Sequence, residues 1–224
     1  MSYTQRDADW VIQKAYLAAQ RKAVPPASST TKYAVLLGQL DSAQDDWRNE
    51  ADTEWESLYQ TVANGTVTAT DTFDLDDEID FISKREGDYI TLSKDGVVQT
   101  VELVAPNQLY SAQNVLAAAR IGRTLKFSKA FGSSSSYLGY TLNIPAYIFT
   151  DDITSGSDLI QCDDPMFLAY MLAAEFVRTD VVKGGQYNNL LDKAAERMAR
   201  MKQNNGGQNN EIPRTALAMG ETWN

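Results

Sequence analysis

The pattern that most resembles a metal site is an alternating acidic run: Asp74, Asp76, Glu78 and Asp80. These residues occupy positions 1, 3, 5 and 7 of a calcium-binding loop, which supplies carboxylate oxygens at that spacing. Position 6 should then be glycine but is Ile79, and position 12 should be glutamate but is Arg85. The pattern therefore predicts an acidic turn between strands, and we expect neither a metal ion nor another cofactor.

A second possible chemistry is glycoside hydrolysis, in which two suitably spaced carboxyl groups suffice. The candidate residues are numerous rather than specific: Asp45, Glu50, Asp52, Glu54 and Glu56. They belong to the polar face of an amphipathic segment, where carboxylates are usually solvated. We therefore expect no enzymatic activity, and a carboxylate-based cell-wall hydrolase remains the enzyme alternative.

Thiol and imidazole chemistry are restricted by composition, because the chain has one cysteine and no histidine. Disulfide scaffolds, zinc sites and histidine-based triads are excluded. Cys162 lies beside an expected helix N-cap, where a thiolate can be favoured, but it has no histidine partner. A buried small residue is the favoured interpretation.

The charge distribution also limits the partners. The 224 residues carry a formal net charge of −10, and residues 41–82 hold thirteen acidic residues against one base, Arg48. Bulk binding to nucleic acid is not expected, because phosphate contacts require positive charge. There is no secretory signal pattern and no apolar run of membrane-spanning length, so we expect a cytosol-like compartment and no membrane.

Apolar residues at spacings of three and four predict helices that would position these groups. The expected helices span about 4–22, 31–59, 165–182 and 186–203, and Asp164-Pro165 is a typical helix start. Trp47 and Trp55 fall on one stripe of the second helix, so core packing is favoured over ligand stacking.

The middle of the chain alternates and is rich in threonine, which predicts strands. Asp95-Gly96 between two such runs predicts a hairpin. The predicted fold class is α+β, a helical bundle body with an inserted antiparallel β domain and an extended C-terminal arm. The predicted parts are an N-terminal helix and linker (1–30), a long amphipathic helix (31–63), a β-rich insertion (64–160), a helix pair (161–203) and the arm (204–224).

Two stretches resemble the head-to-tail adaptor proteins of tailed phages. The first is LLGQLDSAQDDWRNEADTEWESLYQTVANGTVTATDTFDL, and the second is LGYTLNIPAYIFTDDITSGSDLIQCDDPMFLAYMLAAEFVRTDVVKGGQYNNLLDKAAERMARMKQNN. The second contains the pattern DD.T..SD.I..DDP, followed by two helices with a glycine-containing joint. The resemblance covers about residues 31–205 and does not include residues 1–30.

The resemblance implies a structural virion protein at the head–tail junction, assembled in the host cytoplasm. Copies would form a ring, usually twelvefold, below the portal protein, and would extend the channel through which double-stranded DNA passes without specific binding. The next tail or neck protein would bind below. A neck or tail-completion protein of similar size is the alternative.

The resemblance also suggests roles for two groups of residues. The arm 204–224 is expected to be a flexible tail that docks on the portal through apolar anchors: Ile212, Pro213, Leu217, Met219 and Trp223. The acid-rich region is a possible channel lining that would repel DNA phosphates: Asp45, Glu50, Asp52 and Glu56.

Overall fold

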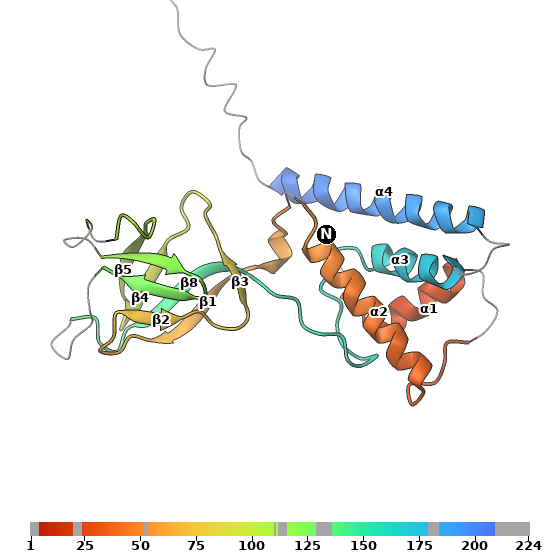
Figure 1. The fold of residues 1–224 in the computed structure, drawn as a ribbon, viewed down its shortest axis with the longest axis horizontal. Coiled ribbons are helices and arrows are strands. Elements are labelled where there is room, and N and C mark those ends of the chain that lie inside the picture. Colours follow the sequence, from red (N-terminus) through yellow and green to blue (C-terminus); the bar gives the residue numbers. More distant parts are fainter. Residues whose placement is uncertain are drawn as a thin grey trace, which may run out of the picture. The chain divides into compact units, whose positions relative to one another are not determined.

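The computed structural model describes residues 5–19, 24–51, 53–109, 111, 116–128, 136–178 and 184–208, with the side chains of 184 and 206–208 excepted. The chain divides into two compact units (Figure 1). One comprises residues 1–57 and 150–224 and is called the helical unit below. The other comprises residues 58–149 and is called the sheet unit.

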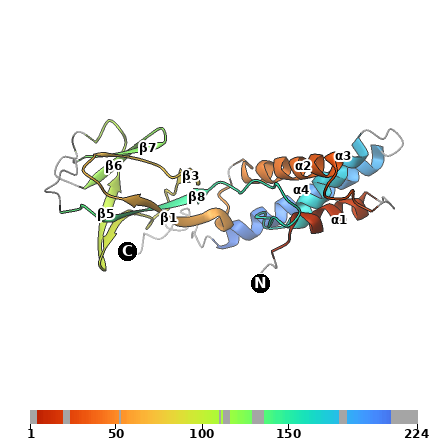
Figure 2. The same ribbon diagram turned by 90° about the horizontal axis from the view of Figure 1, so that it is seen from below.

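The helical unit contains α1 (Ala8–Ala18), α2 (Thr31–Arg48), α3 (Pro165–Arg178) and α4 (Gly184–Gln208). α3 lies among the other three helices and contacts each of them (Figure 2). Five of its residues are buried: Phe167, Leu168, Ala169, Leu172 and Ala173. The predicted Asp-Pro start of α3 is confirmed, because Asp164 Oδ1 accepts the Met166 N–H at 3.0 Å. No helix in the described part of the chain is long and apolar enough to cross a membrane.

The second helix is shorter than predicted. It ends at Arg48 with Asn49 as C-cap, so the helix expected over 31–63 is wrong beyond that point. A 3-10 turn (Glu56–Leu58) follows, and β1 begins at Tyr59. The chain instead turns back so that Trp55 stacks on Trp47 and donates its indole N–H to the Trp47 carbonyl oxygen, a contact that a continuous helix would not allow because it would place the two rings two turns apart.

The described residues of the sheet unit form eight strands, listed in chain order: β1 (Tyr59–Thr66), β2 (Thr72–Asp74), β3 (Ile79–Ile82), β4 (Ile90–Lys94), β5 (Val97–Leu103), β6 (Ala117–Ile121), β7 (Thr124–Phe127) and β8 (Thr141–Ile148). Their order in the sheet is β1-β8-β4-β5-β6-β7-β2, with β3 paired to β8. The sheet curls into a half-barrel around its own core, which includes Leu92, Leu125, Leu142 and Ile144.

The predicted fold class is wrong. The protein is a mixed α/β fold with four helices and an eight-stranded curled sheet, not a helical bundle body with an antiparallel insertion. β5 pairs with β6 in parallel through Glu102–Ala117 and Leu103–Ala118, which a chain of hairpins cannot produce. The sheet unit spans 58–149 rather than the predicted 64–160, because Tyr59 already pairs with Tyr147.

The hairpin predicted at Asp95-Gly96 is confirmed. β4 and β5 are joined by Asp95 and Gly96 with φ of 50° and 80°, and Lys94 pairs with Val97. Positive φ at both central residues is the geometry that Asp-Gly favours in a two-residue loop. The hairpin is therefore determined by residues adjacent in sequence.

Candidate functional site

The pattern DD.T..SD.I..DDP folds into an irregular strap, residues 150–164, that leads from the sheet unit into α3. Asp158 organises its turn, since its Oδ2 accepts the N–H groups of Thr154 and Ser155 at 2.8 and 2.7 Å. These two hydrogen bonds lower the pKa of Asp158. Ile160 and Cys162 point inward and are buried. The acidic residues of this motif are therefore used in part to fold the strap.

The strap is held against the polar face of α2. The Gln44 side chain, 1% exposed, accepts the Gln161 N–H at 2.9 Å and donates to the Asp151 carbonyl oxygen at 3.3 Å. Asp41 Oδ1 accepts the Ile153 N–H at 2.8 Å. This face of α2 is therefore an internal contact surface, which the helical periodicity did not predict.

The four residues predicted as a channel lining have different surroundings. Asp45 is half-buried beside Arg48 at 3.5 Å, and Glu50 accepts from Lys202 Nζ at 2.5 Å. The Glu56 N–H donates to Asn205 Oδ1 at 2.9 Å, while Asp52 lies outside the described residues. Two of the four thus face basic groups of their own chain. The predicted set omitted Asp46, which is exposed on α2.

The acidic loop that resembles a calcium site is a turn between β2 and β3, as the sequence indicated. Asp76 Oδ1 accepts the Glu78 N–H at 3.1 Å, and Asp74 Oδ1 accepts the Thr124 hydroxyl at 3.0 Å. Arg123 donates to the carbonyl oxygens of Asp76 and Ile79 at 2.7 and 3.1 Å. Within the described ranges no cluster of three or more acidic, Cys or His side chains could hold a metal ion.

Cys162 is a buried structural thiol, 3% exposed. Its Sγ lies 3.9 Å from the Met201 sulfur, and burial raises its pKa well above the ordinary value. Burial also raises the pKa of the neighbouring Asp163 carboxyl. A thiol in this environment is protonated at neutral pH and is a poor nucleophile.

The end of α4 is fixed to the segment that follows α2. The Asn205 side-chain amide donates to the Glu54 carbonyl oxygen at 2.7 Å, and its oxygen accepts the Glu56 N–H at 2.9 Å. The helix therefore continues to Gln208 instead of ending at Gln203 as predicted. The proposed anchors lie outside the described residues: Ile212, Pro213, Leu217, Met219 and Trp223.

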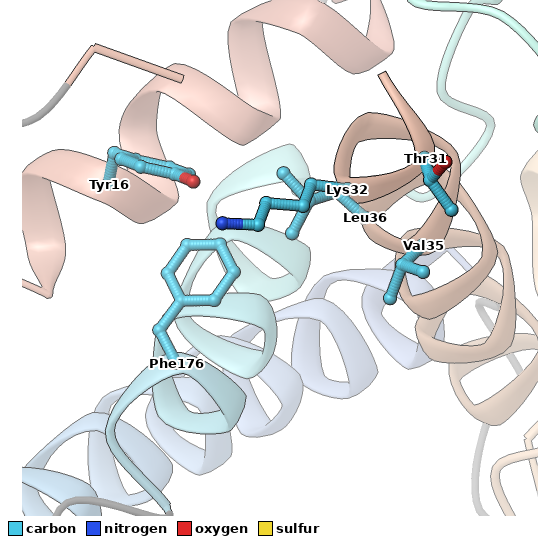
Figure 3. A pocket seen from close by; sticks show the side chains of 6 residues that line it. All are labelled: Tyr16, Thr31, Lys32, Val35, Leu36 and Phe176. Carbon is cyan, nitrogen blue, oxygen red and sulfur yellow. The ribbon is translucent and has the colours of Figure 1, made fainter. Parts of the chain in front are cut away.

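A first open hollow in the helical unit, the α1–α2 groove, has a volume of about 390 Å³. Its walls are Tyr16 of α1, Val35 and Leu36 of α2 and Phe176 of α3. Figure 3 shows the Lys32 ammonium group reaching toward the rings of Tyr16 and Phe176, which pack edge to face with centroids 4.9 Å apart. Val35 is 54% exposed here, so the groove presents apolar surface beside a cation.

A second hollow, the α2–α4 groove, has a volume of about 460 Å³. It is bounded by Asp46 and Glu50 at the end of α2, by Phe167 and Met171 of α3, and by one face of α4: Leu191, Ala194, Ala195, Met198, Ala199 and Lys202. Apart from the charged rim, its lining is aliphatic, aromatic and thioether. Both grooves suit apolar protein segments better than a polar small molecule.

No family model and no curated protein sequence matches this chain.

Proposed function

We propose that the protein is a structural subunit of a tailed-phage virion, the adaptor that joins the portal vertex of the head to the tail. Copies assemble as a ring, usually twelvefold in adaptors of this kind, in which one face meets the portal protein and the other meets the next tail or neck protein. Double-stranded DNA passes through the ring without specific binding. The activity is mechanical rather than catalytic.

The observation that carries this proposal is the fixed end of α4. Because Asn205 holds the last turn of α4 against Glu54 and Glu56, the point at which residues 209–224 join the helical unit is fixed. That segment contains five anchors, Ile212, Pro213, Leu217, Met219 and Trp223. An anchor-bearing segment joined in sequence to a fixed helix end suits attachment to a larger assembly, because burying aromatic and aliphatic side chains drives such contacts.

The open grooves add support for an assembly protein. Val35 lines the α1–α2 groove and is 54% exposed. Apolar surface beside a groove is typical of contact sites between proteins. The resemblance of residues 31–205 to adaptor proteins is the reason for proposing the head–tail junction rather than another assembly.

The channel role of the acidic region is proposed in a narrower form. Asp45 and Glu50 each face a basic side chain, so the excess negative charge of α2 is carried by residues such as the exposed Asp46. A lining of this kind repels phosphates at close range and keeps DNA from adhering.

Electron microscopy of particles made without this gene tests the proposal. The expected particles are heads that lack tails, and supplying the protein should restore attachment. Antibody fragments against the sheet unit should label the vertex between head and tail. Normal tailed particles would overturn the proposal, and label confined below an intact adaptor ring would assign the neck alternative instead.

A further inference from the structure

The outer face of α1 carries an aromatic side chain flanked by cations. Trp10, Lys14 and Leu17 follow one another at spacings of four and three residues, which places them on one face of the helix. Arg6 Cζ and Lys14 Nζ lie 5.1 and 5.3 Å from the centroid of the Trp10 ring. Leu17 is 67% exposed. These four residues are called the α1 ridge below.

The α2–α4 groove has the complementary character. It is an open hollow of about 460 Å³, and its apolar lining includes Met171 of α3 and Met198 of α4. Its rim at the end of α2 is acidic, with the exposed Asp46 beside Glu50, which faces Lys202 at 2.5 Å. An apolar group that carries positive charge at its edge therefore matches both the lining and the rim.

We propose that the α1 ridge of one copy docks in the α2–α4 groove of a second copy of this chain. Trp10 enters the groove beside Met171 and Met198, because thioether sulfur packs favourably against aromatic rings. Lys14 approaches Asp46 at the acidic rim. Charge pairs at the rim of an interface stay accessible to solvent, so Asp46 is not withdrawn from the protein surface.

The ridge of a copy cannot enter the groove of that same copy. The opposite face of α1 is buried, and α1 packs on α3, which also lines the groove. The ridge therefore points away from α3. Four residues form the buried face of α1: Ala8, Val11, Ile12 and Ala15.

The ridge and the groove share no residue, so one copy can offer its ridge to one neighbour and its groove to another. A contact between two different surfaces repeats from copy to copy and closes into a ring when the rotation between copies allows it. The inference thus names the contact between copies in the proposed ring, and it rests on the proposed function for that setting.

The contact is small, so free copies should associate only transiently. A buried aromatic side chain covers about 150–250 Å², whereas a stable interface between two proteins buries about 1,200 Å² or more in total. The ridge supplies one indole, one leucine and two cations. We therefore expect a lasting contact only where the portal holds several copies together and raises their effective concentration.

Paramagnetic relaxation in the full-length protein detects a transient contact of this kind. One batch carries a nitroxide at Gln13→Cys, an exposed position beside the ridge, and the other carries isotope-labelled methionine methyl groups. Cys162 is 3% exposed and therefore should not react with the nitroxide reagent. The nitroxide should broaden the signals of Met171 and Met198 in the other copy. A nitroxide at Val98→Cys, 60% exposed in the sheet unit, is the control and should leave both signals sharp.

Charge reversal identifies the two surfaces. Lys14→Glu in the nitroxide batch, or Asp46→Lys in the isotope batch, should lower the association about fivefold, the loss expected for a solvated charge pair. Mixing these two variants with each other should restore the broadening. Lys32→Glu is the matched control, because Lys32 is an exposed cation of α2 that does not line this groove, and it should have no effect.

Trp10→Ala should lower the association more strongly, about thirtyfold, because a central aromatic side chain dominates a small contact. Circular dichroism verifies that this variant is folded, and the charge variants keep the test decisive if it is not.

Two outcomes would overturn the proposal. Equal broadening by the nitroxides at positions 13 and 98 would show that the ridge does not dock. Loss of broadening in both charge variants without recovery in their mixture would show that Lys14 does not meet Asp46. Both measurements use the purified protein, whereas the adaptor assignment is tested on particles. Heads without tails, together with a failed contact, would retain the adaptor and remove only this interface.

Discussion

Trp55 stacks on Trp47 with ring centroids 5.0 Å apart, and its indole N–H donates to the Trp47 carbonyl oxygen at 2.8 Å. Both side chains are essentially buried, at 1% and 0% exposure. The pair closes the chain back on α2 immediately after the helix ends at Arg48. It therefore stabilises the route by which the chain leaves the helical unit.

Truncation of this pair should be costly. Trp55→Ala removes a buried ring and leaves a cavity, so we expect a loss of about 3–5 kcal/mol. Urea unfolding followed by tryptophan fluorescence is the measurement, because Trp10, Trp47, Trp55 and Trp223 all lie outside the sheet unit. Val24→Ala, at a position 86% exposed, should change the stability by less than about 0.5 kcal/mol. Equal stability of the two variants would contradict the packing account.

Two glycines in the helical unit should respond to alanine in opposite directions. A Cβ on Gly156 would stand 2.0 Å from the Tyr33 hydroxyl and 2.7 Å from the Asp9 carboxylate, so Gly156→Ala must displace that hydrogen-bonded pair. We expect a loss of about 1–3 kcal/mol. Gly38 lies inside α2 with no atom within 4 Å of its added Cβ, so Gly38→Ala should stabilise by roughly 0.5–1 kcal/mol. Urea midpoints that move in the same direction would refute the contrast.

The Tyr33–Asp9 contact should make stability depend on alkaline pH. Burial, then the hydrogen bond to Asp9 and the charges of Asp9, Asp7 and Asp158, raises the pKa of Tyr33 from 10.0 to about 12. The folded state therefore holds this proton more tightly than the unfolded state. The corresponding stability is complete below pH 10 and is lost as the pH rises toward 12.

Absorbance titration of tyrosinate, together with urea midpoints across this range, checks the expected loss. Tyr33→Phe should remove the late-titrating component and flatten the alkaline decline in stability. Tyr89→Phe, at a position 59% exposed, should change neither. A Tyr33 that ionises together with the exposed tyrosines would be inconsistent with the buried hydrogen bond.

Neutralising the predicted lining should affect DNA passage more than folding. The variant carries Asp45→Asn, Glu50→Gln, Asp52→Asn and Glu56→Gln. Half-exposed ion pairs contribute little to the free energy of unfolding, so this variant should differ from the parent protein by less than about 1 kcal/mol. Arg48 and Lys202 would lose their acidic neighbours, and DNA should then leave the particles more slowly.

The matched control removes four exposed charges from the sheet unit: Glu78→Gln, Glu86→Gln, Asp95→Asn and Glu102→Gln. Ejection kinetics of both variants are compared in one assay with the parent particles. Parental rates in the first variant would exclude these residues from the channel lining. Equal slowing in both would show an effect of net charge rather than of position.

The sequence predicted those features that depend on neighbouring residues. The apolar stripe identified the buried Trp47, and Asp95-Gly96 identified the hairpin, because both signals are local. The parallel pairing of β5 with β6 was missed, since it joins Glu102 to Ala117 without a two-residue turn that would mark it in the sequence. Gln44 illustrates the same limit at the candidate site. Its partners Asp151 and Gln161 lie more than one hundred residues away, and a glutamine on a polar face gives no signal of burial.

Loss of the tail anchors should weaken attachment to portal-bearing heads. Deleting residues 209–224 leaves every described helix and strand in place, so the protein should fold while its binding to heads falls sharply. Each buried aromatic or aliphatic side chain is worth very roughly 1.5–3 kcal/mol before ordering costs. Ring assembly multiplies this value, because each docked tail raises the effective concentration of its neighbours.

Trp223→Ala alone should therefore lower the affinity for heads by more than the loss expected for one independent tail. The polar tail substitutions Thr215→Ala and Thr222→Ala should have little effect on this affinity. Pull-down with intact heads over a series of protein concentrations measures all three. Undiminished binding of the truncated chain would show that the anchors Ile212, Leu217, Met219 and Trp223 do not hold this protein to the portal, and attachment would then have to be sought in the α1–α2 groove.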